Sequence, residues 1–134
     1  MKKLLYLSFI ALTIIIIGYS IWYYTFKLDK LYLKYIRTPD IEIEWYFHST
    51  ITTITPDVIT VKKGSELDTV CISRNIADVY LISDVIYIDF YGYPIGKSGS
   101  DSISIPDTIL GYHIRYKTDK KKDSPVWRYS FKKN

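Results

Sequence analysis

The stretch DIEIEWYFHS at positions 40–49 decides the fold class, because apolar and polar side chains alternate along it. Four apolar side chains occupy every second position, namely Ile41, Ile43, Trp45 and Phe47. The positions between them carry Glu42, Glu44, Tyr46 and His48. A period of two is typical of a β-strand that buries one face. We therefore predict a half-buried strand here.

Similar runs follow toward the C-terminus, separated by turn residues. Two short runs flank Gly64, and two longer ones meet at Ser83 and Asp84 as a hairpin. Further runs cover 101–105, 108–117 and 126–132. Fourteen tyrosines and frequent branched residues also favour strands. We expect seven or eight strands in one all-β domain over residues 38–134, a small antiparallel sandwich or barrel-like fold.

An apolar segment precedes this region, since no charged residue occurs from Leu4 to Phe26. A helix of that length reaches about 35 Å, which is enough to cross a hydrocarbon core of about 30 Å. Aromatic residues near its end are typical of the membrane interface, and these are Trp22, Tyr23 and Tyr24. We expect residues 4–26 to lie in a lipid bilayer.

The competing interpretation is a signal peptide cleaved after Ser20, behind small Gly18. Cleavage there would leave an apolar, aromatic N-terminus, so we favour a retained anchor. Helical spacing of apolar residues continues to Arg37, and Pro39 ends it. Residues 1–37 are thus predicted to form a signal-anchor helix with a juxtamembrane extension. Both flanks are basic, and the signal-like layout places the C-terminal domain outside the cytoplasm.

Chemical motifs are weak in this chain. GYPIGKS at 92–98 has three residues between its glycines where a phosphate-binding loop needs four, and no helix pattern follows. Cys71 lies in a strand pattern and is expected to be a buried apolar side chain, with no link to His48 or His113. We interpret Asp89 as an outward carboxylate among tyrosines. No catalytic residue, cofactor or metal ion is predicted.

Charge is distributed unevenly along the predicted domain. From Thr38 to Ile114 four basic residues face eleven acidic ones, whereas from Arg115 to Asn134 eight basic residues face two. If the last two runs pair as a hairpin, one exposed face carries a candidate binding patch for an anionic surface or partner, composed of Arg115, Lys117, Arg128 and Lys132. The other face of the last run, with Trp127, Tyr129 and Phe131, is expected to join the core.

These observations favour a membrane-tethered, non-enzymatic module of the cell envelope that binds or scaffolds a protein or an anionic envelope component, as an accessory or inhibitory subunit. One alternative is an extracytoplasmic enzyme, such as a hydrolase, which a cluster of Asp, His or Cys side chains in one cleft would favour. A second alternative is a nucleic-acid binder that uses the basic hairpin, which requires a cytoplasmic domain. Nucleic acid is not expected with the predicted topology.

A retained anchor makes a direct prediction about the mature N-terminus. Mass spectrometry of the protein extracted from membranes should find peptides that precede Ser20. A chain that starts at Ile21 would show that the segment is a cleaved signal peptide.

Overall fold

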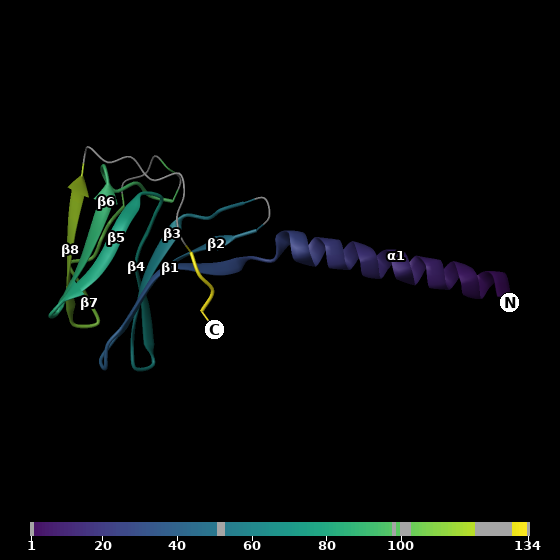
Figure 1. Ribbon diagram of the computed structural model, residues 1–134, viewed down its shortest axis with the longest axis horizontal. Coiled ribbons are helices and arrows are strands. Elements are labelled where there is room, and N and C mark those ends of the chain that lie inside the picture. Colours follow the sequence, from purple (N-terminus) through teal and green to yellow (C-terminus); the bar gives the residue numbers. More distant parts are fainter. Residues whose placement is uncertain (1, 51–52, 98, 100–102, 120–129, 134) are drawn as a thin grey trace.

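The computed structural model describes residues 2–50, 53–97, 99, 103–119 and 130–133. It is mostly β, with one N-terminal helix and two four-stranded sheets (Figure 1). The first sheet has the order β1-β2-β3-β4, with bounds Asp29–Arg37, Glu42–Ser49, Asp57–Lys63 and Glu66–Ser73. The second has the order β5-β6-β8-β7, with bounds Ile76–Ile82, Val85–Tyr91, Tyr112–Asp119 and Thr108–Ile109.

One apolar core draws side chains from both sheets. Its largest fully buried member is Phe90 on β6, and Ile43 on β2 and Ile59 on β3 come from the first sheet. The predicted alternation of 40–49 is confirmed, because Ile41, Ile43 and Trp45 are buried while the residues between them are not. The predicted turns at Gly64 and at Ser83–Asp84 are also present, since each joins two paired strands.

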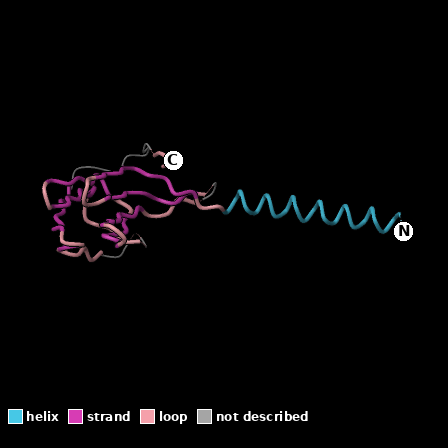
Figure 2. Tube along the Cα trace, turned by 90° about the horizontal axis from the view of Figure 1, so that it is seen from below, coloured by secondary structure: helices cyan, strands magenta, loops and turns pink. Residues whose placement is uncertain are grey.

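The helix α1 spans Lys2–Phe26 and projects away from the sheets (Figures 1 and 2). The prediction that it continues to Arg37 was wrong, because Asp29–Arg37 forms β1 and pairs antiparallel with β2. The register of β1 shifts between Tyr32 and Lys34. A bulge of this kind interrupts the period of two, and the apolar positions then resemble helical spacing.

The prediction of a purely antiparallel fold was wrong, because β6 and β8 pair in parallel. A long connection after β6 returns the chain to the other end of the sheet, and the short β7 then forms a hairpin with β8. Leu110 and Gly111, at the tip of this hairpin, both have positive φ, as a type I′ turn requires. The predicted strand at 101–105 was wrong for its described part, since residues 103–105 lie in the connection.

The last described residues also depart from prediction. Phe131 forms a two-way backbone pairing with Tyr32 of β1, with both N···O distances 2.8 Å, and their rings stack. The expected hairpin with β8 is therefore wrong at this position, and Phe131 lies outside the core with 45% of its surface exposed. Trp127 and Tyr129 lie outside the described residues.

The buried side chain of Asn75 joins the two sheets and the long connection. Its amide nitrogen donates to the carbonyl oxygens of Tyr91 and Tyr93, and its amide oxygen accepts from the Ile95 N–H at 3.0 Å. Ser73, also buried, donates to the Ile95 carbonyl at 2.6 Å. These bonds fix the passage from β4 to β5 against the start of the connection.

We expect Asn75→Leu to destabilise the domain strongly. Leucine is similar in size but leaves the backbone groups at Tyr91, Tyr93 and Ile95 without partners, and each buried unpaired group costs about 1–3 kcal/mol. Urea unfolding should show a loss of at least about 2 kcal/mol. Glu66→Ala, at an exposed position of β4, serves as the control and should change stability by less than about 0.5 kcal/mol. Equal stability of the two variants would contradict the role given to Asn75.

Candidate functional site

The outer face of the second sheet carries polar and aromatic side chains that the core does not use. We define this outer face by the outward positions of β5, β6 and β8, which are Asp78, Tyr80, Tyr87, Asp89, Arg115 and Lys117. Tyr80 and Tyr87 stack across the β5–β6 pair with ring centroids 5.1 Å apart. Arg115 lies beside Tyr87 on β8, and Lys117 lies beside Asp89.

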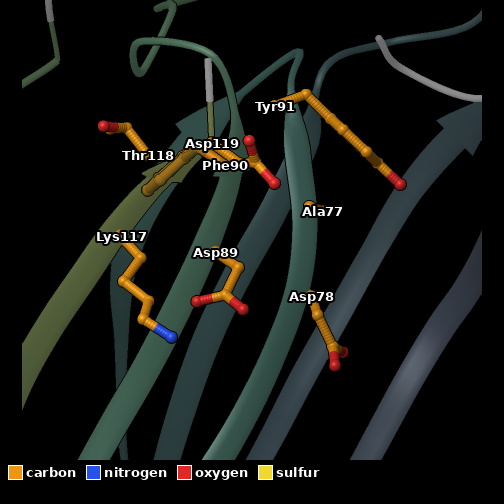
Figure 3. A pocket seen from close by; sticks show the side chains of 8 residues that line it. All are labelled: Ala77, Asp78, Asp89, Phe90, Tyr91, Lys117, Thr118 and Asp119. Carbon is orange, nitrogen blue, oxygen red and sulfur yellow. The ribbon is translucent and has the colours of Figure 1, made fainter. Parts of the chain in front are cut away.

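A hollow of about 500 Å³ occupies one end of this face. Its polar lining includes Asp78, Asp89, Lys117 and Asp119, and Tyr91 lies at its rim (Figure 3). The Lys117 side chain extends toward the carboxylate of Asp89 (Figure 3). One Asp89 oxygen, Oδ1, is shut off from solvent and lacks a hydrogen-bond partner among the described residues.

Two carboxylates face each other directly in this hollow, because Asp78 and Asp89 are register partners. Directly opposed like charges destabilise a strand pair. Lys34 of β1 reduces the repulsion between the two carboxylates, because its ammonium lies 2.7 Å from Asp78 Oδ1. Asp78 also accepts from the Val79 N–H at 2.8 Å. Asp78 is thus engaged by Lys34 and by the Val79 N–H, which leaves Asp89 and Lys117 as the groups available to a partner.

The interpretation of Asp89 as an outward carboxylate among tyrosines agrees with its position, but Asp78 was not singled out from the sequence. The sequence nevertheless contains the information that places Asp78 opposite Asp89. A two-residue turn at Ser83–Asp84 sets Ile82 opposite Val85, and counting back along both strands places Asp78 opposite Asp89. The remaining lining comes from β8, whose place beside β6 has no local signature in the sequence.

The four residues of the predicted basic patch do not form one surface. Arg115 and Lys117 are exposed on β8 in the second sheet, whereas Lys132 lies beside β1 in the first sheet. The Lys132 ammonium is 2.8 Å from Asp29 Oδ2. Arg128 lies outside the described residues. The separation follows from the pairing of Phe131 with Tyr32 in place of β8.

The outer face of the first sheet holds a cluster of aromatic and charged side chains. The Lys30 ammonium lies 2.6 Å from Glu44 Oε2 and 3.8 Å from the centroid of the Tyr46 ring. Lys133 approaches Glu44 Oε1 at 3.2 Å and the Tyr35 ring centroid at 3.9 Å. Partial burial opposes ionisation of Glu44, but the hydrogen bonds from both lysines prevail and lower its pKa. The two lysines and Glu44 thus pair with one another and stabilise the fold.

The residues considered for catalysis are not arranged for it. Cys71 is buried on β4, and its burial, together with the Asp57 carboxylate, raises the pKa of the thiol to about 12. His48 packs edge-on against the Tyr46 ring on β2, and His113 is exposed on β8. Over the described part of the chain, no three His, Cys, Asp or Glu side chains are grouped so as to hold a metal ion.

The predicted membrane-interface residues Trp22, Tyr23 and Tyr24 lie in the last two turns of α1. The stretch Tyr6–Phe26 is long and apolar enough to cross a membrane, and none of its most apolar window is buried in the protein. Length and composition alone do not distinguish such a helix from a signal sequence. The Lys27 ammonium lies over the Tyr23 ring, 5.4 Å from its centroid, at the end of the apolar run.

Comparison with known proteins adds no assignment, since no family model, curated protein or solved structure matches this chain. The functional interpretation therefore rests on the residues themselves.

The environment of Cys71 predicts an unreactive thiol. At pH 8 the native protein should resist iodoacetamide, because a thiol with a pKa of about 12 is almost entirely protonated. Reaction should be rapid after unfolding in urea. Cys71→Ser should cost about 1–3 kcal/mol, because it buries a hydroxyl in an apolar site. Fast alkylation of the folded protein would indicate an activated cysteine.

Proposed function

We propose that this protein is a single-pass membrane protein whose β domain, a small sandwich outside the cytoplasm, is a non-enzymatic module that binds a protein partner. The observation that carries the proposal is the contrast between its two parts. The β domain has its own core, while the apolar side chains of α1 have no cover within the described protein.

A lipid bilayer is the environment that fits α1. Its large apolar side chains are exposed on all sides, which in water would be a costly hydrophobic surface. Aromatic residues and Lys27 at its end match the chemistry of the interface. The proposed topology rests on the signal-like layout of the N-terminal segment, in which Lys2 and Lys3 precede the apolar run.

The outer face of the second sheet is the proposed binding surface. Tyrosine and arginine are the residue types enriched at energetically important positions of protein interfaces, and here Tyr80, Tyr87 and Arg115 lie side by side. Lys117 makes no ion pair with any residue that the structure describes, so its charge is available. The chemistry favours a partner that presents acidic side chains beside an apolar patch.

The same hollow supports the enzyme hypothesis less than it supports the binding hypothesis. Three aspartates line it, but Asp78 is held by Lys34, and neither a histidine nor a cysteine is among its lining residues. The nucleic-acid hypothesis loses its basis, because it required a continuous basic hairpin and Lys132 pairs with Asp29 at β1.

Site-specific photo-crosslinking in membranes tests the binding surface. A p-benzoylphenylalanine at position 87 should give a discrete adduct in cells, identifiable by mass spectrometry. Arg115→Glu with Lys117→Glu should reduce the adduct at least tenfold, because it reverses both charges next to the crosslinker. The thermal stability of this double variant should equal that of the unmodified protein.

Two controls separate a real interface from random collision. Lys62→Glu with Lys97→Glu alters net charge equally at exposed positions outside this face, and it should leave the adduct intact. A crosslinker at Leu67, exposed on β4, should give no adduct of the same mass. If position 87 yields no adduct, or if both double variants behave alike, the proposed surface is wrong.

A further inference from the structure

Three segments of the chain meet at the end of the β domain that adjoins α1. The first is the start of β1, which follows the helix directly. The second is the β2–β3 connection, since Asp29 pairs with Ser49 and Ser49 bridges to Ile54. The third is the C-terminal segment, because Lys132 pairs with Asp29. We call the surface made by Lys27, Leu28, Ile54, Phe131 and Lys132 the helix-proximal end.

The connection between α1 and β1 is too short to separate this end from a membrane. Only Lys27 and Leu28 lie between the two elements, and the Lys27 N–H still bonds to the Tyr23 carbonyl at 2.9 Å. Three extended steps from Phe26 to Asp29 cover at most about 11 Å. The headgroup layer on each side of a bilayer is roughly 5–8 Å thick. With Trp22–Tyr24 at the interface, β1 begins within or just above the headgroups.

The side chains at this end suit such a position. Ile54 is 66% exposed and Leu28 is 55% exposed, although both are apolar. The carboxylate of Asp29, which would repel phosphate groups, is neutralised by Lys132 at 2.8 Å. Lys27 adds an exposed positive charge at the junction. Exposed apolar side chains beside a lysine fit the boundary between headgroups and acyl chains.

We infer that the helix-proximal end is a second lipid-binding surface, which lies on the bilayer with Ile54 and Leu28 inserted at the headgroup boundary. The inference rests on the proposed membrane-spanning role of α1. It adds that the β domain does not swing freely on its tether. Its orientation is fixed, so the β3–β4 turn, at the opposite end of the first sheet, points away from the membrane.

Fluorescence quenching in nanodiscs tests this arrangement with the full-length chain. Single cysteines are placed in a Cys71→Ser background by Ile54→Cys, Leu67→Cys and Tyr24→Cys, and each is labelled with an environment-sensitive dye. Leu67 is the matched control, because it is 65% exposed but lies on β4, where it pairs with Lys62 far from the helix. Lipids with a spin label near the headgroup act as quenchers in discs of zwitterionic and anionic lipid.

We expect strong quenching and blue-shifted emission at positions 24 and 54, and neither effect at position 67. Quenching at position 54 should increase in anionic discs, since Lys27 adds a net positive charge to this end. If the dye at position 24 is quenched but the dye at position 54 is quenched no more than the dye at position 67, the helix-proximal end does not bind lipid. The membrane-spanning role of α1 would still hold. If position 24 is also unquenched, α1 does not lie in the bilayer and the proposed function itself fails.

Discussion

The amide of Asn75 is the interaction on which the two-sheet arrangement depends. It lies where the chain leaves the first sheet and enters the second, and it bonds to the backbone on both sides of Gly92 in the long connection. A buried amide with all its groups paired permits one geometry, because any shift would leave polar atoms unsatisfied in the core. That geometry sends the chain back along the sheet and makes the parallel pairing of β6 with β8 possible.

The tether and the domain impose constraints on each other. Only two residues separate β1 from α1, and the C-terminal segment covers part of the free edge of β1 near Tyr32. The outer face of the second sheet has no such cover from the described residues. The tyrosines, Arg115 and Lys117 on this face therefore remain accessible.

Local patterns in the sequence were sufficient for the strands whose neighbours follow directly in the chain. The strand β2 alternates cleanly, and the pairs β3–β4 and β5–β6 meet at short turns. These strands and the antiparallel pairing within the two hairpins could therefore be predicted. The strand β1 was mistaken for helix, because the bulge after Tyr32 disrupts its alternation. The opposition of Asp78 and Asp89 follows from the turn between them. The hollow beside them could not be predicted from that turn, because β8 comes from a distant part of the chain. Lys132 was misplaced for the same reason, since the C-terminal segment pairs with the distant strand β1.

The pairing of Tyr32 with Phe131 has a consequence for biosynthesis. These residues are separated by almost the whole length of the β domain, yet they are direct neighbours in the first sheet. A ribosome exposes Tyr32 well before it exposes Phe131. The edge of the first strand near Tyr32 must therefore stay uncovered until Phe131 has been made. Contacts between residues so far apart in sequence also form slowly, because a large loop must close before they contribute any energy. During that interval, a chaperone or a partner with a free strand has its one opportunity to occupy the position that Phe131 later takes.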